Sequence, residues 1–123
     1  MNAAGFFTKV FGKPYRTVDP QQAAAILAAG GVLVDVREAT EWRAGHALEA
    51  RHIPLAQLAD RLGEVSSDRP VVTVCRSGAR SRQAAALLAR NGRQVHNLRG
   101  GMHAWIAAGH PLRAKGGRPG QLI

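Results

Sequence analysis

Short apolar runs alternate with amphipathic stretches along most of this chain. The runs that predict strands are a brief extended entry at 17–18 and buried segments at 32–36, 71–74 and 95–98. The stretches that predict helices begin with Asp19-Pro20 and stop at Gly30-Gly31, then cover 38–44, 55–62, 81–90 and 102–108. Strands that alternate with helices in this way give an α/β fold with a mostly parallel sheet.

The only cysteine, Cys75, lies between the apolar run 71–74 and the helical pattern that begins at Ser81. Ligands of open parallel sheets bind at the carboxyl ends of strands, where this thiol is expected. Backbone N–H groups in a tight loop before a helix bind anions, and Gly78 allows the required backbone conformation. Arginines 76, 80 and 82 add positive charge. We therefore expect a lowered pKa for the Cys75 thiol and an anionic substrate at this loop.

A free cysteine is also compatible with a buried, inert structural thiol. The run Arg-Ser-Gly-Ala-Arg-Ser directly after Cys75 favours a functional thiol instead.

Three stretches carry a resemblance to the rhodanese-type sulfurtransferases. Cys75-Arg-Ser-Gly-Ala-Arg80-Ser81 resembles the active-site loop of that family. Val34-Asp35-Val36-Arg37-Glu38, with Glu41-Trp42 and Gly45-His46 behind it, resembles the first signature, and Leu98 to Trp105 resembles the last. Their order and spacing match the family over about residues 17–112. The resemblance implies a single rhodanese-like domain with about five strands and helices on both faces of the sheet.

The same resemblance implies roles for individual residues. Cys75 would be the nucleophile, and the loop that binds substrate and persulfide would consist of Arg76, Ser77, Gly78, Ala79, Arg80 and Ser81. Asp35 and Arg37 would be supporting residues, and His46 would be structural. The departures from the family pattern are Glu49, where Gly is common, and His52, where Asn is common. No cofactor is implied.

The implied activity is the transfer of a sulfane sulfur from an anionic donor, thiosulfate or a persulfide, through a Cys75 persulfide. The acceptor would be cyanide in an assay and a thiol or a protein in the cell. A Cys-dependent phosphatase or arsenate reductase is one alternative. The active-site loop of those enzymes has five residues between its Cys and its Arg, whereas here four residues separate Cys75 from Arg80 and six separate it from Arg82. A non-catalytic binding module, or a carrier that passes sulfur to one partner protein, is the other.

Composition and charge narrow these classes further. A chain of 123 residues supports one domain, and one cysteine excludes both an internal disulfide and a resolving thiol in the same monomer. The fold therefore does not depend on an oxidising compartment, and we expect a cytoplasmic protein. The net charge of +9 divides into +3 from residues 1–16, +3 from 113–123 and +3 from the 17–112 core. A basic catalytic face with two basic ends explains that total without a nucleic-acid partner.

Both ends of the chain are expected to lie outside the 17–112 domain. Residues 1–16 form an extension in which the apolar positions of 6–11 share one helix face, which leaves membrane-surface or partner docking open, although packing on the domain or fraying is favoured. Residues 113–123 are expected to be a flexible basic tail. No secretory signal or membrane-spanning stretch is recognised. His96, His103 and His110 have no metal-ligand spacing, so no metal is assigned.

Overall fold

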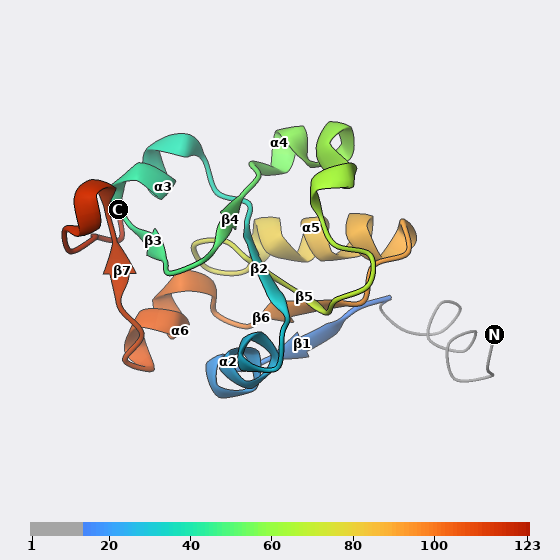
Figure 1. Cartoon of the computed structure of the whole chain (residues 1–123), viewed down its shortest axis with the longest axis horizontal. Helices are drawn as coiled ribbons and strands as arrows, with labels where there is room; N and C mark the ends of the chain where they lie inside the picture. Colours follow the sequence, from blue (N-terminus) through green and yellow to red (C-terminus); the bar gives the residue numbers. More distant parts are fainter. Residues whose placement is uncertain (1–13) are drawn as a thin grey trace.

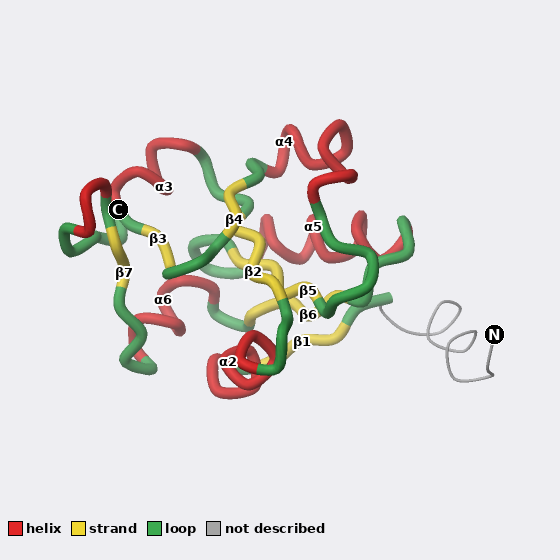
Figure 2. Tube along the Cα trace, in the orientation of Figure 1, coloured by secondary structure: helices red, strands yellow, loops and turns green. Residues whose placement is uncertain are grey.

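The computed structural model describes residues 14–123, which form a five-stranded parallel sheet covered by helices on both faces (Figures 1 and 2). The strands of this sheet are β1 (Arg16–Val18), β2 (Val32–Asp35), β4 (Arg51–His52), β5 (Val71–Val74) and β6 (Val95–Leu98). Their order in space is β1-β6-β5-β2-β4, and each neighbouring pair is parallel. The predicted α/β class and parallel sheet are confirmed.

The helices begin and end within two residues of the predicted bounds, except over 55–62. They are α2 (Pro20–Ala28), α3 (Ala39–Ala44), α4 (Leu55–Leu58), α5 (Ala79–Arg90) and α6 (Gly101–Ala107), with 3-10 helices η1 (Ala59–Glu64) and η2 (Lys115–Gly117). Helix α2 begins as predicted because the Asp19 carboxylate accepts the N–H of Gln22 at 2.7 Å while the Gln22 amide oxygen accepts the N–H of Asp19. The single helix predicted over 55–62 is instead α4 followed by η1.

The central strand β5 divides the core into two layers. The side chains of Val71 and Cys75 face the cluster that α4 and α5 complete, whereas Val72 and Val74 face the cluster completed by α2 and α6. Figure 1 shows α4 and α5 on one side of the sheet and α2 and α6 on the other. A strand that is buried on both faces accounts for the uninterrupted apolar run at 71–74.

The candidate site lies at the carboxyl ends of the central strands. Strands β6, β5 and β2 are neighbours and run in the same direction, so their carboxyl ends meet at that edge. Cys75 directly follows β5, the backbone of Val36 after β2 donates to the carbonyl of Val74 at 3.0 Å, and Gly100 follows β6. The topology therefore brings all three sequence signatures to one place.

Residues 113–123 lie against the domain, in contrast to the flexible tail expected from the sequence. Strand β7 (Leu112–Arg113) pairs antiparallel with β3 (His46–Ala47), and the N–H of Gln121 donates to the carbonyl of Ala44 at 2.8 Å. A Cβ on Gly120 would stand 2.7 Å from the Cα of Gly45. Gly120, one of the glycines that indicate flexibility in the sequence, therefore allows close backbone packing.

The proposed docking segment at 6–11 lies outside the described residues. The strand that opens the domain, β1, begins at Arg16, next to the predicted boundary at 17. The boundaries 1–16, 17–112 and 113–123 remain predictions as domain divisions.

Candidate active site

The Cys75 thiol is buried at the point where β5 ends and α5 begins. Cys75 is 1% exposed, and its Sγ accepts the N–H of Gly78 at 3.0 Å. Gly78 precedes the first turn of α5 with φ of 121°, a conformation that side chains rarely allow. The loop therefore folds back on the sulfur as the sequence pattern predicts.

Hydrogen bonds set the ionisation of this thiol. Burial on its own would raise the pKa of Cys75, but the hydroxyl of Ser81 and the backbone N–H groups of Ser81, Gly78 and Ser77 together hold it below its usual value. The lowered pKa that the sequence predicts is confirmed in direction. Its main causes are the hydroxyl and the amides at the start of α5, whose N–H groups have no partner within the helix, rather than the arginine charges.

The side chains that flank this turn of α5 are themselves fixed by buried polar contacts. The Thr73 hydroxyl donates to the carbonyl of Ser81 at 3.1 Å and lies 3.4 Å from the amide oxygen of Asn97. The Ser81 hydroxyl is within 3.1 Å of the carbonyl of Gly78, so its single proton can go either to that oxygen or to the sulfur. Neither Thr73 nor Asn97 was predicted as a site residue from the sequence. Each is a polar residue inside a buried strand, and that pattern could have indicated a buried hydrogen bond.

The loop is also held from the side of α6. The N–H of Met102 donates to the carbonyl of Cys75 at 2.8 Å, and the N–H of His103 donates to the carbonyl of Arg76 at 3.3 Å. A Cβ on Gly101 would lie 2.6 Å from the carbonyl oxygen of Arg76, so only glycine allows this approach.

Arg80 does not point freely toward a substrate. Its two terminal nitrogens donate to the two carboxylate oxygens of Glu41 in α3, at 2.6 and 2.9 Å. The hydrogen bond from Arg80 is the main reason that the pKa of Glu41 falls to about 2, against the opposing effect of burial. The sequence pattern includes Glu41 in a signature but predicts no role for it, because its partner is 39 positions away.

Asp35 and Arg37 form a buried ion pair beside the loop. Both side chains are fully buried, and the Arg37 guanidinium donates to the Asp35 carboxylate at 2.7 to 3.0 Å and to the carbonyl of Gly45 at 2.8 Å. The geometry fits the supporting role expected for this pair, because each charged group is paired with other groups of the protein and is not available to a substrate.

The rings of two histidines stack on Trp42. His46 lies 3.6 Å from Trp42 between ring centroids and His52 lies 4.8 Å from it, both nearly parallel to the indole. The Nδ1 of His46 is 2.8 Å from the carbonyl of Trp42, and the Nε2 of His52 is 2.7 Å from that of Arg37. Both contacts are structural, which agrees with the expectation for His46. Trp42 is half-buried in this stack and belongs to neither buried cluster.

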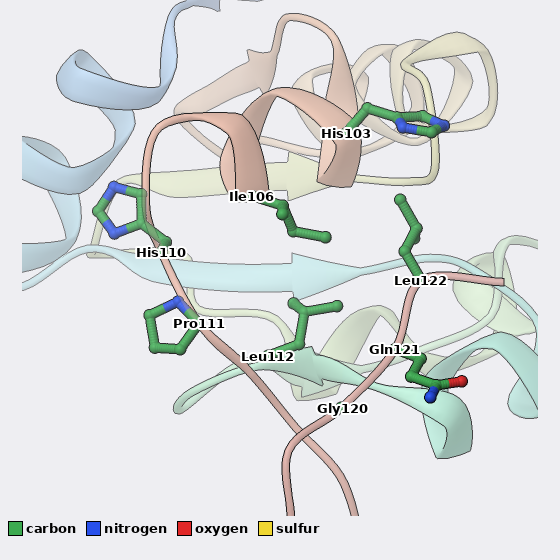
Figure 3. A pocket seen from close by; sticks show the side chains of 8 residues that line it. All are labelled: His103, Ile106, His110, Pro111, Leu112, Gly120, Gln121 and Leu122. Atoms are coloured by element: carbon green, nitrogen blue, oxygen red, sulfur yellow. The ribbon is translucent and has the colours of Figure 1, made fainter.

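The remaining loop residues lie toward the surface. The Nε of Arg76 donates to a backbone oxygen of Ile123 at 2.8 Å, and Ser77 and Ala79 are exposed. A cavity of about 560 Å³ lies between α6 and the C-terminal segment (Figure 3). Ile106, Leu112 and Leu122 point into it, and Cys75 is not among its lining residues.

Over residues 14–123, no group of three or more His, Cys, Asp or Glu side chains is placed to hold a metal ion. Within the same range, no helix has the length and apolar content needed to cross a membrane.

Comparison with known proteins places this geometry in a family. The sequence pattern of the Rhodanese-like domain matches residues 19–108. Uncharacterized protein YqhL of Bacillus subtilis is 44% identical over 84 residues, which are 68% of this chain and 64% of YqhL. Thiosulfate sulfurtransferase GlpE of Pseudomonas savastanoi is 35% identical over 94 residues, which are 76% of this chain and 89% of that protein.

A solved structure agrees with both the sequence match and the fold. The crystal structure of a rhodanese-related protein from Thermoplasma volcanium has a TM-score of 0.74 and 26% identity, and covers 80% of this chain and 97% of that one. The present chain therefore spans less than two thirds of YqhL but most of the other two proteins. It belongs to the rhodanese-like domain family.

Proposed function

We propose that this protein is a sulfurtransferase that moves a sulfane sulfur from an anionic donor, thiosulfate or a persulfide, to a thiophilic acceptor by way of a Cys75 persulfide. The observation that carries the proposal is the buried Cys75 sulfur at the end of β5, which accepts the N–H of Gly78 and has a lowered pKa. A thiolate is the nucleophile that this reaction requires. The likeness to a protein named thiosulfate sulfurtransferase supports the proposal.

The reaction has two balanced half-reactions. The Cys75 thiolate attacks the outer sulfur of thiosulfate, a bond forms between the two sulfurs, and sulfite leaves with the electron pair of the broken S–S bond. The acceptor, cyanide or a thiolate, then attacks the outer sulfur of the Cys75 persulfide and regenerates the Cys75 thiolate. Because one nucleophile serves both steps, ping-pong kinetics are expected.

The residues of the Cys75 loop would have different roles in this reaction. The N–H groups of Ser77, Gly78 and Ser81 would hold the negative charge of the thiolate and then of the persulfide, as an anion site at a helix start does. Arg76 and Arg80 would attract the anionic donor, Gly78 and Ala79 would shape the turn, and Asp35 and Arg37 would support the edge of the sheet.

The rival readings predict different results. A phosphatase or arsenate reductase of related architecture would need an arginine separated from the cysteine by five residues, whereas four residues separate Cys75 from Arg80 and six separate it from Arg82. A partner-specific sulfur carrier would share the persulfide and differ only in the acceptor, with slow transfer to small thiols and fast transfer to one protein.

Intact-mass spectrometry before and after addition of thiosulfate tests the proposal. The expected result is a gain of one sulfur atom that is reversed by cyanide and absent from the C75S variant. Because Cys75 is the only cysteine, no other thiol can produce the gain. No gain with thiosulfate or with an organic persulfide would reject the sulfurtransferase and favour a binding module.

A further inference from the structure

The contact between Glu41 and Arg80 links α3 to the first turn of α5. The carboxylate and the guanidinium face each other through two hydrogen bonds, and their side chains are 14% and 32% exposed. The two-pronged geometry uses both terminal nitrogens of Arg80 and fixes the plane of its guanidinium. Glu41 also accepts the N–H of Glu38 at 2.9 Å, so the carboxylate is itself anchored at the start of α3.

Arg80 lies in the first turn of α5, and its charge attracts the Cys75 thiolate, although the Ser81 hydroxyl and the loop amides contribute more to the lowered pKa of Cys75. The hydrogen bond to Glu41 is the main reason that the pKa of Arg80 is raised; burial opposes it, and attraction to the Cys75 thiolate adds to it. The same attraction must stabilise the thiolate, because the interaction between two charges is mutual. Glu41 stands on the other side of Arg80 with the opposite charge and offsets part of this field.

The other arginines around the loop do not form an exposed or half-buried pair of the Glu41–Arg80 kind. Arg37 is neutralised by Asp35, and Arg76 donates to a backbone oxygen of Ile123. Among the described residues, no Asp or Glu side chain lies within ion-pair distance of Arg76 or Arg82. The charged or titratable side chains on the loop and on the elements around it include Asp35, Arg37, Glu38, Glu41, Arg43, Arg76, Arg80, Arg82, Arg90, Arg99 and His103. Within this set, Glu41 is the acid that cancels an arginine of the loop itself.

We propose that Glu41 determines donor specificity: by holding Arg80 and offsetting its charge beside Cys75, it weakens binding of the thiosulfate dianion and favours small organic persulfides. This inference rests on the proposed sulfurtransferase function. In the favoured reaction the Cys75 thiolate attacks the outer sulfur of R–S–SH, the bond between the two persulfide sulfurs breaks, and the thiolate R–S⁻ leaves with its electron pair. The proton stays with the transferred sulfur, so no oxidant or reductant is needed.

The steady-state kinetics of three proteins test the inference. They are the wild type, Glu41→Gln, and Glu64→Gln as a control that removes an exposed carboxylate paired with Arg51 and Arg61. Glutamine keeps an acceptor for Arg80 and for the N–H of Glu38 but removes the charge. The donors are thiosulfate and 2-hydroxyethyl persulfide, which carries no charge outside its sulfur atoms.

Glu41→Gln should lower the KM for thiosulfate by about fivefold, as loss of one charge at a partly screened site allows. Its KM for 2-hydroxyethyl persulfide and its kcat with either donor should change by less than about twofold. Glu64→Gln should match the wild type with both donors. An unchanged ratio of the two KM values in Glu41→Gln, or an equal loss of activity with both donors, would overturn the inference.

Alkylation of Cys75 by iodoacetamide gives a readout that does not need sulfur transfer. Its rate follows the thiolate fraction, and the single cysteine makes the pH profile unambiguous. Glu41→Gln should move the midpoint to lower pH by about half a unit, whereas Glu64→Gln should not move it. An unmoved midpoint in Glu41→Gln would contradict the charge effect. If Glu41→Gln does not fold, Glu41→Met removes the charge and also releases Arg80, so it should lower the KM for thiosulfate at least as much and the KM for 2-hydroxyethyl persulfide by less than about twofold.

The two proposals fail in distinguishable ways. A wild-type protein that gains sulfur from neither donor rejects the sulfurtransferase function, and the alkylation profiles then still report on Glu41. Persulfide formation by all three proteins with the same donor preference keeps the function and rejects the role of Glu41.

Discussion

The hydroxyl of Thr73 donates a hydrogen bond to the backbone carbonyl of Ser81 across 3.1 Å, with both residues fully buried. Thr73 lies in β5 two residues before the nucleophile, and Ser81 lies in the first turn of α5. The bond therefore joins the strand that presents Cys75 to the turn whose hydroxyl and N–H groups stabilise its thiolate.

Replacement of Thr73 by valine should loosen this joint. Valine keeps the shape of the Thr73 side chain, but the buried carbonyl of Ser81 loses the hydroxyl donor. The free energy of unfolding should therefore fall by about 1–2 kcal/mol. Urea denaturation measures the loss, and Thr73→Ser, which keeps the hydroxyl, should recover most of it. Equal stability of Thr73→Val and the wild type would show that Ser81 is held by its helix alone.

Ser81→Ala should raise the pKa of Cys75 because the thiolate loses the hydroxyl that favours its charged form. A rise of about one unit is expected from the strength of a hydrogen bond to a charged group. The pH profile of iodoacetamide alkylation would then move to higher pH. Ser77→Ala is the matched control, since Ser77 contributes only its backbone N–H and the profile should stay in place. An unmoved profile in Ser81→Ala would mean that the Ser81 proton stays on the carbonyl of Gly78.

Breaking the buried pair of Asp35 and Arg37 should be costly. Asp35→Asn leaves the guanidinium of Arg37 charged and without its carboxylate in a fully buried position, and a loss of about 3–5 kcal/mol is expected. Guanidinium chloride denaturation measures it. The exposed pair of Arg61 and Glu64 provides the comparison, because Glu64→Gln removes a solvent-screened carboxylate and should shift the midpoint only slightly. A small loss in Asp35→Asn would indicate that water or another group reaches Arg37.

Acid should remove the contribution of Glu41 to stability. Its pKa is about 2 in the folded chain and 4.5 ordinarily, so the carboxylate stabilises the fold above pH 4.5 and loses that effect as the pH falls toward 2. Relative to Glu41→Gln, the wild type should lose about 2 kcal/mol of unfolding free energy between pH 5 and pH 2.5. Urea midpoints at both pH values give the difference. A constant gap between the two proteins would contradict a charged contact with Arg80.

The C-terminal segment should resist trypsin in the native protein. Arg113, Lys115 and Arg118 offer cleavage sites, but β7 pairs with β3 and Gly120 packs against Gly45. Gly120→Val should displace the segment and increase cleavage by at least about tenfold, since local opening governs proteolysis. Gly63→Ala, where a Cβ meets open space, should leave the rate unchanged. Cleavage of the wild type at the rate of Gly120→Val would support the mobile tail expected from the sequence.

The sequence predicts the elements that carry strong local signals. Asp19-Pro20 marks the start of α2, and the run 71–74 followed by Cys75 marks the junction of β5 and α5, because each signal lies within a few residues of its consequence. Strands β3, β4 and β7 have two residues each, too few to show a period, and they were not predicted.

Contacts between residues far apart in the sequence were not predicted, for a different reason. Glu41 and Arg80 meet only because the chain folds, and no local pattern distinguishes Glu41 from the exposed Glu38 beside it. The glycines of the C-terminal segment indicate a flexible tail in the sequence. Glycine occurs both in mobile backbone and in tightly packed backbone such as Gly120, and the sequence does not distinguish the two.

The hydrogen bonds from α6 to the loop have a consequence for its polarity. The N–H groups of Met102 and His103 hold the carbonyl oxygens of Cys75 and Arg76 toward α6. A trans peptide unit is planar, with its N–H opposite its C=O, so each held oxygen turns the next N–H away from α6. For the unit between Arg76 and Ser77, that N–H is the one that favours the thiolate. The preference of the loop for negative over positive charge is thus built into the orientation of its peptide planes, and reversal of a single plane would replace attraction by repulsion.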